Sequence, residues 1–205
     1  DGGWGWWFAD TSSPTLNAYA LLALYNAKQA GFAVDDNVMK RAQEFLTRAF
    51  EKSLDVKATY TFNERAFVIF TLTEIGGNYT SRAVALFDQR ANLAHYGKAY
   101  LLMAMQKLKL PQAQTLQSEL TSAAIPSATG AHWEEAQTDY WTMNTNTRST
   151  ALAIMALSRA DPKNAVLANA VRWLMVARKE GHWQTTQETA WSVLALTEYM
   201  QSTGE

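Results

Sequence analysis

Acidic residues are the first side chains in this sequence to consider as catalysts. Two carboxylates on facing elements can act as the acid and base that cleave a glycosidic bond. The candidates are Glu134, Glu135 and Asp139, together with Asp35 and Asp36. Nothing in the sequence places two of them on facing elements, so we expect helix caps and solvated loop acids.

The histidines and the missing cysteines restrict the remaining chemistry. His95, His132 and His182 are far apart in the sequence and fall in different repeats, so we predict no metal site. The absence of cysteine excludes disulfides, cysteine-ligated metals and a cysteine nucleophile within these residues. Phosphate-loop, nucleophile-elbow and zinc motifs are also missing. We therefore predict neither a metal nor a cofactor.

Tryptophans occur at turns that repeat along the chain. Gly3-Trp4, His132-Trp133 and His182-Trp183 each come before a polar helix-start signal and a helix rich in Ala and Leu. A large ring after a turn can pin the next helix to its neighbour. We predict that Trp4, Trp133 and Trp183 are structural turn aromatics.

The first of these turns carries two further tryptophans, Trp6 and Trp7. Its three glycines disfavour a helix. We expect its rings to pack on neighbouring helices, and a ligand platform is the alternative.

These turns belong to an internal repeat. The last complete unit, residues 170–199, combines the end of one helix, a Gly-aromatic turn, and a second helix. We expect this second helix to pack a stripe that contains Trp191, Val193, Leu194, Ala195 and Leu196. Related units recur at an irregular period of roughly 40 residues, which in a helical chain indicates one helix pair per repeat.

Three-four spacing of apolar residues predicts helices along the whole chain, and no segment alternates as a strand would. The predicted helices cover about 14–31, 36–49, 62–75, 81–90, 93–110, 111–125, 146–160, 161–181 and 185–199. A long loop from Ser127 to Thr142 holds Trp133, Tyr140 and Trp141.

Composition indicates a well-buried globular chain. Of 205 residues, 48% are hydrophobic and 18% are charged, and the formal net charge is −1. This balance suggests neither nucleic acid nor an anionic membrane as a partner. No apolar run is long enough to insert into a membrane. We expect a single domain, 1–205, that is a piece of a longer protein, because the chain begins at Asp1 without a Met.

The predicted helices, numbered in chain order, differ in how their apolar residues are distributed around the helix axis. Odd-numbered helices are rich in Ala and Leu nearly all round, whereas even-numbered ones are one-sided and charged, which favours an inner and an outer layer. We predict an all-α fold, an α/α toroid of helical hairpins that is incomplete on its N-terminal side.

Two known families share parts of this pattern. The segments 170–174 and 178–183 resemble the QW repeat of triterpene cyclases, with Arg178 where that family has Gln. A match over the whole chain resembles the thioester-containing domain of the α2-macroglobulin and complement family, in its bacterial branch. It rests on segments in the family's order and spacing, namely 1–4, 16–19, 131–134, 148–153, 171–174 and, above all, Thr186-Gln187-Glu188-Thr189-Ala190-Trp191.

The second resemblance implies a protease inhibitor without enzymatic turnover. In that family, cleavage of a bait region exposes a Cys-Gln thioester, which a lysine or hydroxyl group of the protease attacks. The reactive Cys-x-Glu-Gln segment would lie upstream of Asp1, and Trp7 would correspond to an aromatic residue that shields the thioester. A histidine that assists transfer to hydroxyl groups is missing, because residues 46–92 contain none.

The same resemblance implies the partners and the location. The partners would be target proteases and the other domains of a parent macroglobulin. The location would be periplasmic or extracellular, through a lipid-anchored parent.

Two alternatives remain open. A terpene cyclase or prenyltransferase would be an enzyme on the same toroid. However, Val34-Asp35-Asp36-Asn37 is a poor substitute for the cyclase motif Asp-x-Asp-Asp, and the prenyltransferase zinc set needs a cysteine. The other alternative is a passive interaction module without a thioester.

Overall fold

The computed structural model describes residues 1–7, 9–52, 59–137 and 142–204. As predicted, the fold is all-α. The α-helices are α1 (Pro14–Gln29), α2 (Asp36–Lys52), α3 (Thr59–Glu74), α4 (Thr80–Phe87), α5 (His95–Lys107), α6 (Ala113–Ser122), α7 (Asn146–Ala160), α8 (Leu167–Ala177) and α9 (Thr186–Thr203). A 3-10 turn, η2 (Arg90–Asn92), separates α4 from α5.

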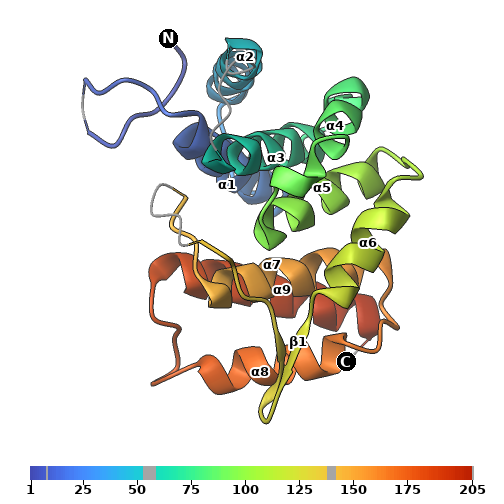
Figure 1. Cartoon of the computed structure of the whole chain (residues 1–205). Helices are drawn as coiled ribbons and strands as arrows, with labels where there is room; N and C mark the ends of the chain where they lie inside the picture. The colour runs from blue at the N-terminus through green and yellow to red at the C-terminus, as the bar shows by residue number, and fades with distance from the viewer. Residues whose placement is uncertain (8, 53–58, 138–141, 205) are drawn as a thin grey trace.

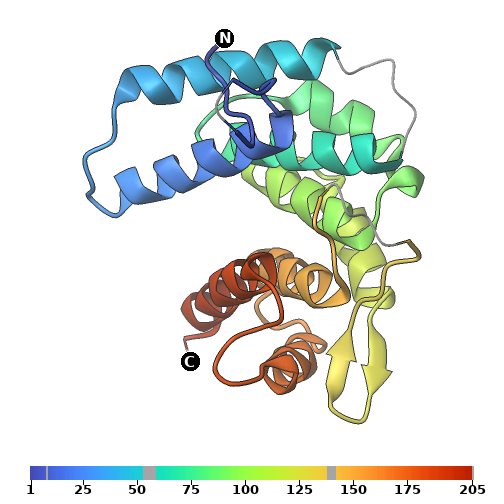
Figure 2. The same ribbon diagram turned by 90° about the vertical axis from the view of Figure 1, so that its left-hand side faces the viewer.

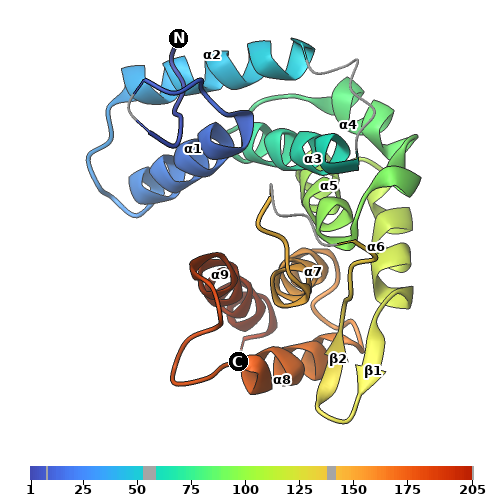
Figure 3. The same cartoon turned by 60° about the vertical axis from the view of Figure 1, so that its left-hand side comes forward.

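The odd-numbered helices follow one another around an inner arc. Helix α1 packs on α3, α3 on α5, α5 on α7, and α7 on α9. Figure 3 shows this arc, with α2, α4, α6 and α8 outside it and with α1 and α9 at its two ends. Figure 1 and the turned view in Figure 2 show the N-terminal and C-terminal halves as two groups of helices that meet through α5, α6 and α7.

Three inner helices begin with the same side-chain cap. The hydroxyl groups of Ser13, Thr145 and Thr185 accept hydrogen bonds from the backbone N–H three residues later, at the starts of α1, α7 and α9. Such a cap satisfies one of the backbone donors that a helix start leaves unpaired. The polar residues after each Gly-aromatic turn therefore fix where the inner helices begin.

One short strand pair accompanies the helices, although no segment of the sequence alternates as a strand would. Residues of the predicted 127–142 loop belong to an antiparallel hairpin of β1 (Ile125–Ser127) and β2 (Gly130–His132). Each strand has three residues, which is too short to display an alternating pattern. Strand β2 packs on α8, so the hairpin covers an outer helix.

Helix α8 begins six residues later than predicted, at Leu167. Two side chains hold the preceding segment in turns, because Asp161 Oδ1 accepts from the N–H of Lys163 and Asn164 Oδ1 accepts from the N–H of Val166. Such Asx turns compete with the helix. The helix also ends earlier, at Ala177, since residues 179–182 form a β-bridge turn.

The core lies between the inner helices. Every residue of α7 from Arg148 to Ser158 is buried, as is most of α5. The packing predicted for the last helix was wrong at two positions, since Val193 and Leu194 are 52% and 39% exposed. Both belong to α9, the helix at one end of the arc in Figure 3.

Candidate functional site

Trp133 and Trp183 are held by the same pair of hydrogen bonds. The Nε1–H group of Trp133 donates to the carbonyl oxygen of Leu120 on α6 at 2.9 Å, and that of Trp183 donates to Leu174 on α8 at 2.9 Å. The backbone N–H of each tryptophan donates to a threonine hydroxyl on the inner helix that follows, Thr150 or Thr189. Each ring thus ties an outer helix to the next inner helix.

Trp4 belongs to the corresponding turn before α1, but its backbone makes the contacts. Its carbonyl oxygen accepts from the N–H of Ser13 at 2.9 Å and from Nδ2 of the buried Asn17 at 3.2 Å. The half-buried ring packs against the core. Asn17 therefore holds the start of the chain against α1.

Trp6 and Trp7 contradict the expected packing of the first turn. They are 61% and 80% exposed, although residues of their type usually find cover. The segment that carries them forms a loop before α1 in Figure 1, and Arg48 of α2 donates to the carbonyl oxygen of its first residue, Asp1. Together with Trp4 they line a pocket of about 700 Å³.

The most buried charge in the described part of the chain belongs to Arg148 on α7, a residue that no local sequence motif marks. Its Nη2 donates to the hydroxyl of Tyr19 on α1 at 2.9 Å and to that of Tyr100 on α5 at 3.0 Å. The guanidinium also faces the ring of Tyr96 at 5.1 Å. Trp191 on α9 completes the group by donating from Nε1 to the Tyr19 hydroxyl at 3.3 Å.

This group joins four inner helices at the centre of the arc. Burial raises the pKa of Tyr100, so its hydroxyl stays protonated and accepts the hydrogen bond as a neutral group. Burial disfavours the charge of Arg148, but its tyrosine partners outweigh that effect and raise its pKa. A permanently charged arginine and neutral phenols do not form an acid-base pair. The centre can therefore hold helices together but cannot transfer protons near neutral pH.

The acidic candidates have structural partners. Glu135 accepts from the backbone N–H groups of His95 and Tyr96 at the start of α5, and from the hydroxyl of Ser149. Glu134 contacts Nε2 of His132. These contacts are those of a helix cap and a loop acid.

The second acidic pair lies at the start of α2. Asp35 accepts from the N–H of Asn37, and Asp36 pairs with Lys28. Asp139 lies outside the described residues, as do Tyr140 and Trp141.

The described ranges contain neither a metal cluster nor a membrane-spanning helix. No three His, Cys, Asp or Glu side chains gather there as a metal site. His132 instead stacks on Trp173, with ring centroids 4.7 Å apart. No helix in the described part combines the length and apolar character needed to cross a bilayer.

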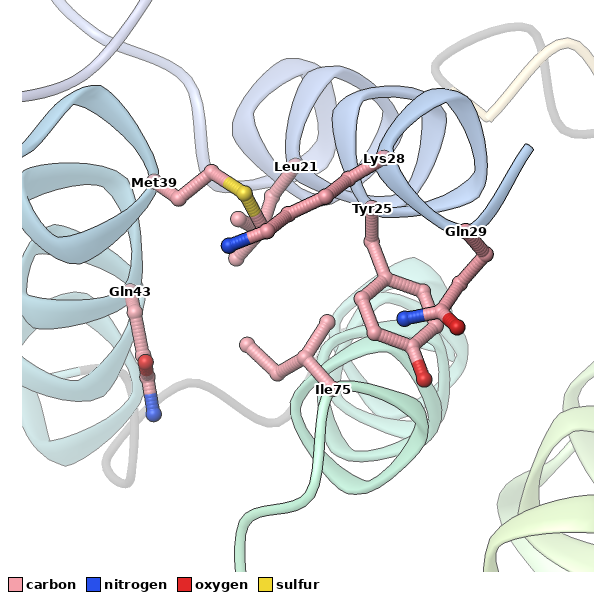
Figure 4. Close-up of a pocket in the computed structure, with 7 residues that line it drawn as sticks. All are labelled: Leu21, Tyr25, Lys28, Gln29, Met39, Gln43 and Ile75. Carbon is pink, nitrogen blue, oxygen red and sulfur yellow. The ribbon is translucent and has the colours of Figure 1, made fainter. Parts of the chain in front are cut away.

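A smaller pocket of about 190 Å³ lies between α1, α2 and α3. Figure 4 shows Leu21, Met39 and Ile75 around it, with four polar side chains, those of Tyr25, Lys28, Gln29 and Gln43. Its charged side chain, Lys28, is already paired with Asp36. This pocket has the size of a single side chain and offers no nucleophile or acid-base pair.

The chain is similar to known proteins in fold and not in sequence. The sequence matches no protein-family model, and no curated protein sequence matches it. Native α2-macroglobulin from Escherichia coli, spanning domain MG7 to the C-terminus, matches 98% of this chain with a TM-score of 0.73 and 14% identity. Salmonella α2-macroglobulin reacted with methylamine matches 96% with a TM-score of 0.77 and 18% identity. The fold is one that bacterial α2-macroglobulins contain.

A third match is the trypsin-activated α2-macroglobulin of Escherichia coli, with a TM-score of 0.76 and 16% identity over 98% of this chain. The chain spans 32%, 13% and 14% of the length of these three macroglobulin chains. It therefore corresponds to one segment of a much larger molecule in each case.

Proposed function

We propose that this chain is part of the thioester domain of a bacterial α2-macroglobulin-like protease inhibitor. The observation that carries the proposal is the match of at least 96% of the chain to α2-macroglobulins from two bacteria. The Cys-x-Glu-Gln segment lies outside this chain, which has no cysteine. Residues 1–205 form one domain whose part is to hold and cover the thioester, not to turn over a substrate.

The proposed chemistry is an acyl transfer. The unprotonated nitrogen of a protease lysine attacks the thioester carbonyl carbon, the carbon–sulfur bond breaks, and the cysteine leaves as a thiolate. The proton that the nitrogen loses goes to the thiolate or to water, and an amide joins the two proteins. The trap holds the protease close, so proximity replaces a base.

One property of the chain and one of a relative support transfer to amines. Residues 46–92 contain no histidine that could activate a hydroxyl group. In addition, the Salmonella relative was solved after reaction with methylamine. We propose amine nitrogen as the preferred nucleophile.

Trp7 is the proposed shield of the thioester. Its ring is 80% exposed in this chain alone, so it is free to cover a group supplied by another part of the parent protein. The other partners are target proteases and the remaining domains of that parent. The proposed location is periplasmic or extracellular, through a lipid-anchored parent.

An enzyme on the same fold is the less favoured function. The Arg148 centre lacks an acid-base pair, and the acidic candidates Glu134, Glu135, Asp35 and Asp36 bind groups of their own chain. The other alternative is a passive module whose parent protein has no thioester. Residues 1–205 are the same under both hypotheses, so only a reaction of the parent protein distinguishes them.

The test uses the parent protein, activated by a protease in the presence of a labelled amine and a labelled polyol at equal concentration. We expect covalent capture of the amine in large excess over the polyol. Preferential capture of the polyol would show that another residue does the work of the histidine. Capture of neither label would favour the passive module.

A further inference from the structure

The pocket formed by the first turn has the composition of a site for an organic cation. Its lining consists of Trp4, Trp6 and Trp7, the acids Asp1 and Asp10, and the small residues Gly3, Gly5, Ala9 and Ser12. No lysine, arginine or histidine is among the described lining residues. Aromatic faces attract ammonium groups, and carboxylates add to that attraction.

Exposure separates these indoles from others in the chain. Trp133, Trp183 and Trp191 are only 0%, 4% and 3% exposed, whereas Trp6 and Trp7 are 61% and 80% exposed. A protein that covers these three tryptophans almost completely gains nothing in folding from two bare rings at one place. Exposed aromatic groups that gather at one site mark a binding surface.

The turn is held in shape by its own hydrogen bonds. Asp10 Oδ2 accepts from the N–H of Trp7 at 3.0 Å, and the N–H of Asp10 donates to the carbonyl of Trp7 at 3.1 Å. Gly5 allows this approach, because a Cβ atom there would lie 2.6 Å from Cβ of Asp10. The carboxylate is thereby fixed beside the backbone of Trp7, the residue whose ring is the most exposed of the described tryptophans.

Asp1 is fixed in a similar way. Its Oδ1 accepts from the N–H of Gly3 and from the hydroxyl of Ser12 at 3.0 and 2.8 Å. Two arginines of α2 lie against this segment. Gly2 packs against Arg41, and Nη2 of Arg48 donates to the carbonyl oxygen of Asp1, not to a carboxylate. Within the described part of the chain, each carboxylate therefore keeps one oxygen for a ligand.

We propose that this tryptophan pocket binds alkylammonium groups. In proteins, such a group is found at the end of the lysine side chain. The four-carbon stem lies against the indoles while the ammonium lies over an indole face, near Asp10. The binding is non-covalent. Its use for docking a protease lysine before acyl transfer rests on the function proposed above, and the nitrogen must lose its proton to water before it attacks.

The test follows the indole N–H signals of the 205-residue chain by nuclear magnetic resonance at low ionic strength. Butylammonium is the probe, and n-butanol is its uncharged match. We expect saturable shifts of the Trp6 and Trp7 signals with butylammonium and no saturable shift with butanol. Added salt should weaken the binding, because the contribution of the carboxylates is screened.

Two variants and one control locate the site. Trp7→Leu and Asp10→Asn should each weaken butylammonium binding by about two- to fivefold, the range expected for one cation–π or charge contact at an exposed site. Asp10→Asn keeps an oxygen that accepts from the N–H of Trp7, so the turn persists. Phe32→Ala, which removes a ring 69% exposed elsewhere, should change nothing.

Equal shifts with butanol, or no shift with butylammonium, would overturn the inference. Either result would leave the acyl-transfer proposal standing, because labelled amine capture by the parent protein is measured separately. Conversely, a parent without a thioester would not affect binding measured on this chain.

Discussion

Tryptophan has two different roles in this chain, and burial separates them. Trp183 lies between α8 and α9 with its ring covered and its Nε1–H paired. Trp6 has most of its ring in solvent and lies on a turn that precedes the first helix. The sequence presents both after glycines, so the residue type alone does not reveal which ring is structural.

Trp183→Ala should therefore destabilise the chain strongly. The substitution empties a covered site and leaves the Leu174 carbonyl without its donor, so we expect a loss of about 3 to 5 kcal/mol. Urea denaturation followed by circular dichroism measures it. Trp6→Ala is the matched control and should change the unfolding midpoint little; a Trp183→Ala midpoint equal to the parent's would refute the proposed helix tie.

Glu119 on α6 provides a prediction about pH. Burial alone would raise its pKa, but the hydrogen bonds and charges of Lys98 and Arg90 outweigh burial and lower it. Because the pKa is lower in the folded state, this carboxylate stabilises the fold above its unfolded pKa and loses that effect as the pH falls through the folded value.

We expect Glu119→Gln to lower the melting temperature at pH 7. The difference from the parent should shrink steadily as the pH falls below 4.5, the ordinary value for glutamate. Glu44→Gln, on the exposed side of α2, is the control and should show no such trend. A difference that widened in acid would contradict this assignment.

Among the elements, the hairpin depends on a single glycine. Gly130 has a φ of +140°, and a Cβ atom there would lie 2.1 Å from the Asn169 carbonyl oxygen and 2.9 Å from the Trp173 nitrogen. Both atoms belong to the backbone of α8, which cannot move aside as a flexible side chain would. Only glycine, which has no Cβ atom, fits where two backbones approach each other this closely.

Gly130→Ala should lift the hairpin from α8. We expect a loss of stability clearly larger than the roughly 1 to 2 kcal/mol that left-handed backbone strain costs an alanine. Gly31→Ala isolates that strain, since Gly31 has a φ of +88° with nothing within 4 Å. Thermal unfolding of both variants gives the comparison, and equal losses would show that the hairpin does not need this contact.

The helices could be predicted from sequence because their signals are local. Ser13, Thr145 and Thr185 cap the helices that they precede, and apolar spacing gives the elements themselves. The hairpin was not predicted, because three-residue strands are too short to show alternation of apolar and polar residues. It is also stabilised by packing of β2 on α8, which is distant in the sequence. The Arg148 centre was missed because its tyrosines come from helices 129 and 48 residues away in the chain.

The exposure of Trp6 and Trp7 in the first turn also depends on distant parts of the chain, so it could not be predicted from the local sequence. Glycines and tryptophans indicate a turn, but whether a helix covers the rings depends on the path of the chain. Here, hydrogen bonds of Asp1 and Asp10 to residues of the same turn shape the segment, and Asn17 and Arg48 attach it to α1 and α2. These contacts hold the backbone of the turn but leave the rings of Trp6 and Trp7 exposed.

For the whole molecule, the notable feature is that the arc has two unlike ends. On α9, a face without charge is exposed along Ala190, Val193, Leu194, Thr197 and Met200, which are spaced by three and four residues. On α1, Leu16, Ala20, Leu24 and Ala27 are half-buried and Ala23 is exposed. An apolar helix face normally packs against another element.

We therefore expect the isolated chain to associate weakly or to bind an apolar dye through these two faces. Val193→Glu combined with Met200→Lys should suppress both effects, because the charges oppose packing of an apolar surface. The change adds one charge of each sign, so net charge stays constant and repulsion between molecules cannot explain the result. Thr47→Ser, at a half-buried position of α2, is the control and should leave association and dye binding unchanged.

A protein extended upstream of Asp1 should behave like the double variant if its added helices cover the same faces. Analytical ultracentrifugation and dye fluorescence measure both proteins at matched concentrations. If the extended and isolated proteins associate equally, the arc is a closed domain already, and the open ends are ordinary surface. If the extension alone abolishes association, the uncharged face of α9 is a surface that the parent molecule buries.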